Sequence, residues 1–478
     1  MTPRQNDLPG AAGSGAAPFA GSPGRGWPEL PAALRAIATR PNEAGYGPRS
    51  GTYLRRGAPA LILAAGTEPE AAAAVRYAAA VRERAGELSP GRVPFSVRSG
   101  GHGLSGSGTN DGGIVLDLSG LAQVRVAGDG TGRFTAQAGA TWGRVAAALG
   151  PQDRALSSGN IGGTGVGGLI TAGGVGFFAR AQGLSLDHVQ RLRVLDGRGN
   201  VRWVDAERDA ERFWALRGGA TQAGIVLEAV LDAPRLGSSA GDASVIHQEV
   251  QYLLTDLPGF VEAWGDWMRE APREAESFLM LQARGDGRTV AQARNVWAND
   301  RIEQARATLE AALGLAPVLG QQAVVVPYPR LVPDPGRTAT RSPIEMRSAL
   351  VNRADATLGA ALEQTLGHRS TMLAELRALG GAVADVPSAA TAWAGRHQEA
   401  LVATWAHPDG ARDADEGFAP VRALGSGSYG AYATETGSAA AERAWPGATG
   451  TRLRAVADRV DPDRLFDAGL VLSPHGPG

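Results

Sequence analysis

The 478-residue chain contains no cysteine and no lysine. Without cysteine, disulfides, thiolate nucleophiles, zinc–cysteine sites and cysteine-held iron–sulfur clusters are excluded. Without lysine, all 47 basic residues are arginine, which excludes a Schiff-base lysine, a pyridoxal phosphate site and the lysine of a phosphate-binding P-loop. The basic residues balance 48 acidic ones and leave a formal charge of −1. We therefore expect neither nucleic acid nor a membrane surface as a partner.

One uncharged stretch, residues 155–179, has the length of a membrane span, but nine of its 25 residues are glycine. Each glycine costs about 1 kcal/mol in a helix, so we predict buried irregular backbone there and not a span. Residues 1–26 are mostly glycine, alanine, proline and serine without an apolar run. This composition predicts a disordered tail, and the lack of an export signal favours the cytoplasm.

The first half of the chain mixes helical and strand patterns. Thr67 and Glu70 form a capping box that predicts a helix reaching Gly86. Short β-type runs at 93–97 and 114–118 bracket a glycine-rich turn. Further segments are expected as strands at 134–138 and 224–231 and as helices at 142–149 and 206–216. The fold class is therefore α+β.

The pattern changes after residue 236, where helical segments become longer and glycine rarer. We predict helices at 257–270, 301–313 and 440–459, and strands at 277–282, 321–326 and 382–386, forming a sheet with one covered face. The predicted division is a tail (1–26), a first domain (27–236), a second domain (237–420) and a C-terminal segment returning to the first (421–478).

Several common sites do not fit the sequence. The seven histidines lack zinc-ligand spacing, and no nucleophile elbow precedes a helix, so we expect no metal and no serine triad. Residues 163–168 match the dinucleotide fingerprint, with Asp187 at a suitable distance downstream. Gly173, Gly174 and Gly176 would interrupt the helix that this fingerprint must open, which argues against a Rossmann fold.

Two glycine clusters remain, at 98–113 and 162–176. Consecutive glycines let backbone N–H groups approach a pyrophosphate closely, because no Cβ collides with the ligand. Arg98 adds a cation beside the first cluster. The clusters suit a dinucleotide held across a cleft.

Seven segments, spread over nearly the whole chain, together resemble one family. They are 97–102 (VRSGGH), 110–118 (NDGGIVLDL), 173–177 (GGVGF), 183–187 (GLSLD), 213–219 (FWALRGG), 224–226 (GIV) and 461–466 (DPDRLF). In this order and spacing they look like the berberine-bridge-enzyme-like oxidases, near the bacterial 6-hydroxy-D-nicotine oxidase type. The resemblance implies a two-domain PCMH-type FAD-binding fold (vanillyl-alcohol-oxidase type), whose substrate domain is an antiparallel sheet covered by helices.

By this resemblance FAD is the cofactor, joined covalently to His102. A neutral imidazole is a suitable nucleophile near pH 7. Many relatives have a second link through a cysteine, where this chain has Ile161, so attachment can only be single. The other cofactor-binding residues implied are Arg98, Ser99, Gly100, Gly101, Gly103, Leu104, Gly106, Gly162, Gly163, Thr164, Gly167, Gly168, Thr171, Gly173, Gly174, Gly176, Gly224, Ile225 and Val226.

The chain departs from the family at Leu169, which often corresponds to histidine, and at Gln222-Ala223, which usually correspond to Asn-Phe. Both concern the surroundings of the flavin ring. Thr164 falls where the family places the residue that controls oxygen access, and its shape favours an oxidase over a dehydrogenase.

Tyr429 is the candidate catalytic base, from the family's Tyr-x-Asn-Tyr motif, which here lacks the asparagine. The role requires its pKa of about 10 to be lowered by a cation or the flavin. The alternative is that Tyr429 and Tyr432 are both strand residues with one buried face. In either case Tyr432 is expected to pack. Tyr328 could line the pocket. Arg396 and His397 lie in a segment, residues 393–397, that also resembles the family, but a helix-surface role is at least as plausible for them.

The resulting expectation is an oxidase that moves hydride from a small, specialised-metabolite substrate to flavin N5, with O2 reoxidation giving H2O2. The alternatives are a flavin-containing non-redox cyclase or isomerase and a non-catalytic binding protein. The sequence reveals neither the substrate nor the oligomeric state.

Overall fold

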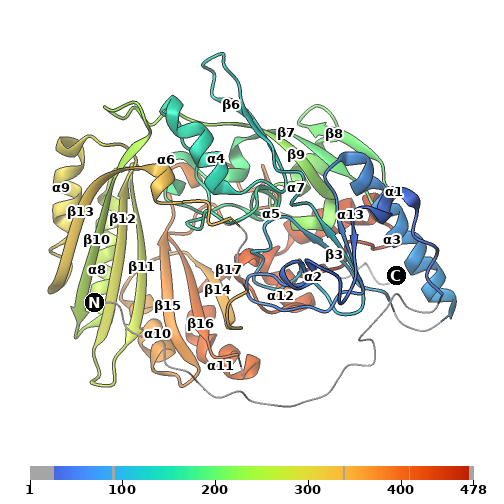
Figure 1. Ribbon diagram of the computed structural model, residues 1–478. Coiled ribbons are helices and arrows are strands. Elements are labelled where there is room, and N and C mark those ends of the chain that lie inside the picture. Colours follow the sequence, from blue (N-terminus) through green and yellow to red (C-terminus); the bar gives the residue numbers. More distant parts are fainter. Residues whose placement is uncertain (1–25, 89–91, 337–339, 409, 473–478) are drawn as a thin grey trace.

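The computed structural model describes residues 26–88, 92–336, 340–408 and 410–472, which contain three β-sheets (Figure 1). The tail expected at residues 1–26 therefore lies outside the described residues, except for Gly26. Within the described ranges, no helix combines the length and apolar character that a membrane crossing needs.

The first sheet has four strands in the order β1 (Ala38–Thr39), β2 (Leu61–Ala64), β4 (Ile114–Asp117) and β3 (Phe95–Arg98). β2 and β3 both run parallel to β4. Helix α3 (Glu68–Leu88) covers the sheet and begins at the predicted capping box, where the Glu70 carboxylate accepts from the Thr67 N–H at 3.0 Å. The expected strand, glycine turn and strand are confirmed.

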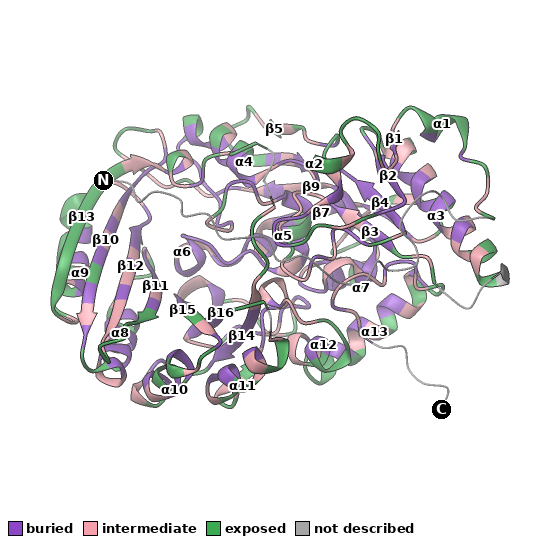
Figure 2. Cartoon of the chain, turned by 60° about the horizontal axis from the view of Figure 1, so that its bottom comes forward, coloured by how far each residue is buried: buried purple, intermediate pink, exposed green. Residues whose placement is uncertain are grey.

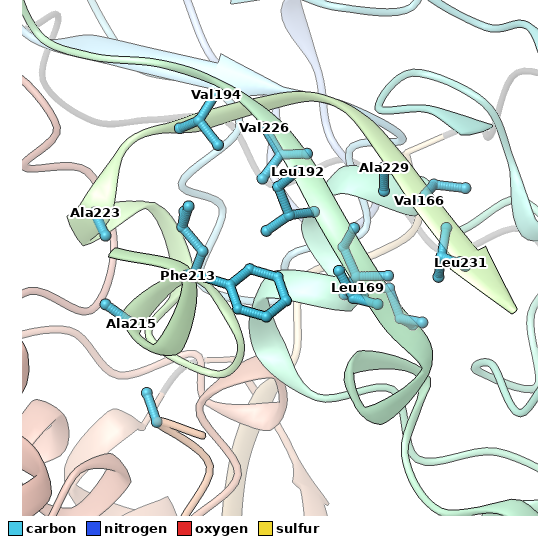
Figure 3. Packing of buried hydrophobic residues seen from close by; sticks show 14 of the residues in the cluster. Val166, Leu169, Leu192, Val194, Phe213, Ala215, Ala223, Val226, Ala229 and Leu231 are labelled. Carbon is cyan, nitrogen blue, oxygen red and sulfur yellow. The ribbon is translucent and has the colours of Figure 1, made fainter. Parts of the chain in front are cut away.

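The second sheet has five antiparallel strands in the order β5 (Val124–Val126), β6 (Arg133–Gln137), β9 (Ile225–Asp232), β7 (Val189–Leu195) and β8 (Val201–Asp205). Helices α4 (Trp142–Leu149), α5 (Val166–Ala172) and α7 (Ala210–Leu216) share one apolar core with it. Figure 3 shows Phe213 of α7 and Leu169 of α5 packed beneath Leu192 and Val226.

The third sheet has eight antiparallel strands. Their order is β13 (Val318–Pro327), β10 (Ser244–Leu254), β12 (Thr289–Trp297), β11 (Ala275–Ala283), β15 (Thr371–Ala378), β16 (Ala400–Ala406), β14 (Glu345–Val351) and β17 (Gly425–Gly427). The helices that cover its outer face in Figure 1 are α8 (Leu257–Glu270), α9 (Ile302–Ala312), α10 (Ala356–Gly367) and α11 (Ala411–Arg422). The predicted antiparallel sheet covered by helices is confirmed.

The remaining elements are short or C-terminal. The α-helices are α1 (Ala32–Arg35), α2 (Tyr46–Ser50), α6 (Ala179–Gln182), α12 (Ser438–Ala444) and α13 (Ala448–Val460). The 3-10 turns are Gly150–Gln152, Ser185–His188, Ala220–Ala223, Tyr328–Arg330, Gly381–Val383 and Gly430–Tyr432. Because β17 joins the third sheet while α13 packs near α7, the C-terminal segment touches both halves. The predicted domain boundaries stay a proposal.

Three local predictions need correction. The strand expected at 382–386 is wrong, because Gly380 and Gly381 have φ of 84° and 52° and start a 3-10 turn. The single helix expected at 440–459 is two helices, separated at Pro446 and by Gly447 with φ of 58°. The stretch 155–179 is largely buried as expected, but it contains the regular helix α5.

Candidate functional site

The two glycine clusters meet backbone to backbone. A Cβ added to Gly100 would lie 2.3 Å from the Gly165 nitrogen, and one added to Gly165 would lie 2.2 Å from the Gly100 nitrogen. Real Cβ atoms do not approach backbone so closely, so only glycine permits this contact. The turn after β3 and the loop before α5 therefore form one continuous surface.

This surface, the glycine wall, is one wall of a cavity of about 610 Å³. Of the residues implied by resemblance, those that line it are Arg98, Ser99, Gly100, Gly101, His102, Gly103, Leu104, Thr164, Gly168, Thr171 and Tyr429. Ile161 and Leu169 line it as well. The structure thus brings together His102 and Tyr429, which are far apart in the sequence.

The other implied residues are not part of the cavity lining. They are Gly106, Gly162, Gly163, Gly167, Gly173, Gly174, Gly176, Gly224, Ile225 and Val226, none of which lines the cavity. Several of these glycines allow close packing instead: a Cβ on Gly167 would lie 2.7 Å from that of Ala138, and a Cβ on Gly162 would lie 2.0 Å from the Pro333 oxygen. Ile225 and Val226 are buried in β9.

His102 lies on the glycine wall with its imidazole stacked on Tyr53, at 5.0 Å between ring centroids and 19° between planes. Burial, aided by the positive charge of Arg341, lowers the pKa of His102 to about 4. The imidazole is therefore neutral at pH 7, the form that acts as a nucleophile.

The glycine wall has room for FAD. A Cβ on Gly168 would meet nothing within 4 Å, and one on Gly103 would come no nearer than 3.5 Å to another atom. Backbone N–H groups that no side chain covers are able to bind the phosphate oxygens of a dinucleotide. The residues present therefore fit FAD.

Arg98 lies beside the first glycine cluster, as expected, but its charge is paired within the protein. Its guanidinium forms a buried ion pair with Asp117 at 2.7 Å and donates to the Gly51 carbonyl at 3.0 Å and to the Arg49 carbonyl. The β3–β4 register places Arg98 directly opposite Asp117. Its charge is compensated within the protein, so its main contact is structural.

The opposite wall, the sheet wall, comes from the eight-stranded sheet. Phe278 and Met280 of β11, Glu375 and Arg377 of β15, and Trp405 of β16 line it. Arg377 forms an ion pair with Glu375, and its guanidinium lies over the Phe278 ring at 4.4 Å. Both charged side chains are less than 10% exposed, at 3% and 9%. Sequence reasoning missed this pair.

Tyr429 lies between the two walls. Its hydroxyl accepts from the Gly174 N–H at 3.2 Å, and its ring meets Trp393 edge-on at 4.8 Å. Burial raises the pKa of Tyr429, while the Gly174 amide and the charge of Arg377 lower it to a smaller extent. Arg377 therefore acts in the direction that the catalytic role requires, but burial outweighs it and the pKa of Tyr429 is raised. Tyr432 packs on Tyr429 as expected, and it also lines the cavity, 5.0 Å from the Arg377 guanidinium.

Two further expectations are wrong. Tyr328 does not line the cavity, because it is buried against Phe178 with its hydroxyl 3.2 Å from that of Ser158. Arg396 has no helix-surface role: it is fully buried in a loop and bonds both Asp187 oxygens at 2.8 Å. Asp187 is therefore a salt-bridge partner and not a ribose-binding acid.

The cavity contains other residues that the sequence did not reveal. These are Tyr53, Arg341, Trp393, Glu375, Arg377 and Trp405. Alternation along β15 could have placed Glu375 and Arg377 on one face, but nothing in the sequence indicated which face.

Residues 59–205 match the family described as FAD binding domain. An FAD-linked oxidoreductase of Metarhizium anisopliae is 37% identical over 139 residues, which cover 28% of this chain and 27% of that protein. A chitooligosaccharide oxidase of Gibberella zeae has the same identity over 139 residues, 28% of each chain. An FAD-dependent monooxygenase of Fusarium proliferatum is 35% identical over 38% of this chain and 34% of its own length. These alignments span about a quarter to a third of the relatives.

Solved structures match over almost the full length. The 6-hydroxy-D-nicotine oxidase of Arthrobacter nicotinovorans has a TM-score of 0.76 at 21% identity, covering 92% of this chain and 98% of its own. A berberine-bridge-enzyme-like protein of Physcomitrella patens has a TM-score of 0.77 at 18% identity, covering 93% and 99%. These likenesses show the fold.

Proposed function

We propose that this chain, which has an FAD binding domain over residues 59–205 and the PCMH-type fold of the berberine-bridge-enzyme-like oxidases, is an FAD-dependent oxidase. The substrate is a small, specialised metabolite whose reacting C–H lies next to nitrogen, oxygen or an activated ring. Dioxygen is the second substrate and H2O2 the product. Thr164, on the cavity wall, is consistent with oxygen access.

One observation carries the proposal: His102 and Tyr429 lie on the walls of a single cavity that also contains the buried pair Glu375–Arg377. When bound, FAD would accept a hydride from the substrate and pass its electrons to dioxygen. His102 would hold it covalently through the imidazole that burial keeps neutral. The glycine wall would bind its phosphates through backbone N–H groups.

Tyr429 would take the proton that leaves the substrate. The Gly174 N–H and the Arg377 charge both stabilise the phenolate, the direction that this role requires, although burial outweighs them in the resting protein. The aromatic rings of Phe278, Trp393 and Trp405 would stack on the substrate and exclude water.

The test begins with the visible spectrum of the purified protein and acid precipitation. We expect the yellow colour to stay with the pellet. His102→Ala should release it, while His397→Ala, a change at an exposed histidine outside the cavity, should not. Colourless protein, or colour released from the wild type, would contradict the attachment.

Anaerobic mixing with candidate substrates then tests the oxidase activity. The panel includes oligosaccharides and hydroxylated nitrogen heterocycles, which the names of the relatives suggest. A substrate that bleaches the flavin and yields H2O2 on admission of air supports the proposal. Substrate conversion without bleaching would instead support the non-redox cyclase or isomerase.

A further inference from the structure

The strand β13 is an exposed edge of the eight-stranded sheet. Among the residues that the structure describes it pairs only with β10, and Figure 2 shows it exposed over most of its length at the margin of the molecule. Four apolar side chains on it are 39–55% exposed: Val318, Leu319, Val324 and Val325. The ten residues of β13 include no charged side chain. Such an edge is a template for another strand.

The other sheet edges are protected in the usual ways. β1, β3, β5, β8 and β17 contain between two and five residues. β3, β5 and β8 also carry charged side chains, and short or charged edges discourage pairing. β17 has only three residues and an irregular register, so it offers little for β13 of another molecule to pair with. Head-to-tail pairing is therefore disfavoured.

The backbone of β13 shows which groups face outward. The Tyr328 N–H donates to the Ala243 carbonyl at 3.1 Å, and the register continues regularly from Ser244–Pro327 to Gln251–Gly320. Because hydrogen-bonded and non-hydrogen-bonded pairs alternate along antiparallel strands, every second residue turns its N–H and C=O away from β10. These residues are Gln321, Ala323 and Val325. They are arranged symmetrically about Ala323.

We propose that β13 is a dimer interface, on which a second copy of the chain pairs its own β13 antiparallel across a two-fold axis at Ala323. In this register Gln321 lies opposite the second copy's Val325, and the two copies of Ala323 face each other. Every outward N–H and C=O of the three residues then has a partner. Val324 and Val325 leave water close to the axis. The two sheets become one continuous sheet, closed by the symmetry.

Cysteine cross-linking tests this register, and a single introduced cysteine is the unique thiol because the chain has none. In Ala323→Cys the two thiol-bearing residues face each other with Cα atoms about 5.5 Å apart, within the span of about 4.4–6.8 Å that disulfides bridge. Gln321→Cys is the matched control, since its two copies lie four residues apart along the strands, or roughly 13 Å at about 3.3 Å per residue. We expect oxidised dimers at least ten-fold more abundant with Ala323→Cys. Equal cross-linking, or a maximum at another position of β13, would overturn the register.

Sedimentation of the flavin-bound full-length protein over a wide concentration range tests the dimer itself. Ala323→Lys places two like charges opposite each other at the axis and should give monomer. Ala448→Lys adds the same charge at an exposed position of α13 and should leave the dimer intact. An unchanged flavin spectrum shows that both variants are folded. A wild type that stays monomeric, forms open polymers, or keeps its dimer in Ala323→Lys would overturn the proposal.

Discussion

Replacing Asp187 by asparagine should destabilise the protein by several kilocalories per mole. The Asp187 carboxylate bonds the Arg396 guanidinium at two places, 2.8 Å each, and also accepts from the Leu184 N–H at 2.9 Å. The Arg396 side chain is 0% exposed and that of Asp187 is 9% exposed. Asp187→Asn keeps the shape and removes the charge, which leaves a buried arginine without its counter-ion.

Removing one partner of a buried ion pair costs about 3–5 kcal/mol. Unfolding entropy is about 2.1 cal/mol/K per residue, or about 1 kcal/mol/K for this chain if it unfolds as one unit. The unfolding midpoint should therefore fall by about 3–5 °C. Differential scanning calorimetry on the flavin-bound protein measures this shift.

The matched control is Glu416→Gln, which breaks the exposed pair between Arg412 and Glu416, 90% and 54% exposed. Exposed pairs contribute about 0–1 kcal/mol, so the midpoint should barely move. The double variant Asp187→Leu with Arg396→Met removes both charges and should be less destabilised than Asp187→Asn. A shift for Asp187→Asn no larger than that of Glu416→Gln would refute the reasoning.

Three further outcomes follow from the cavity. Tyr429→Phe should slow anaerobic flavin reduction by roughly 100-fold, measured by stopped flow. Tyr328→Phe, a change outside the cavity, should not slow it. Equal reduction rates in Tyr429→Phe and the wild type would place the base elsewhere. The pKa of His102 is about 4 in the folded protein and 6.5 ordinarily, so the unfolded chain binds the proton first as the pH drops. The thermal unfolding midpoint of flavin-free protein should therefore fall as the pH drops from 6.5 to 4. In His102→Gln this fall should be shallower. In flavin-free protein, Gly100→Ala should cost about 1–3 kcal/mol by forcing the two loops apart, whereas a Cβ at Gly168 meets nothing within 4 Å and should cost little. Thermal unfolding that ranks the two variants the other way would contradict the packing.

Local signals in the sequence predicted elements well where one residue pattern dominates. The helices expected at 142–149 and 257–270 have the observed bounds of α4 and α8, because their apolar residues repeat at helical spacing. The strand β15 escaped prediction because it carries Glu375 and Arg377 among its buried residues. Their charges belong to the cavity, and a functional strand breaks the apolar pattern that identifies ordinary strands.

The motifs in the sequence identified site residues but not the contacts that these residues make. The motifs identified His102 and Tyr429, and the structure brings them to one cavity. The partner of Arg98 depends on the parallel pairing of β3 with β4, which places it opposite Asp117. The environment of Tyr429 depends on Gly174 and Arg377, contributed by two distant segments. Contacts set by tertiary packing leave no local trace in the sequence.

Arg377 shows how the two walls of the cavity depend on each other. Its guanidinium donates to the Val175 carbonyl and the Asn160 side chain of the glycine-rich region, each at 3.3 Å. The same group lies between the rings of Phe278, on the sheet wall, and Tyr432, beside the candidate base. Because one buried cation contacts all of these segments, the position of the sheet wall is fixed relative to the glycine wall. A cofactor held on one wall and a substrate on the other would therefore meet at a defined separation, which a transfer between them requires.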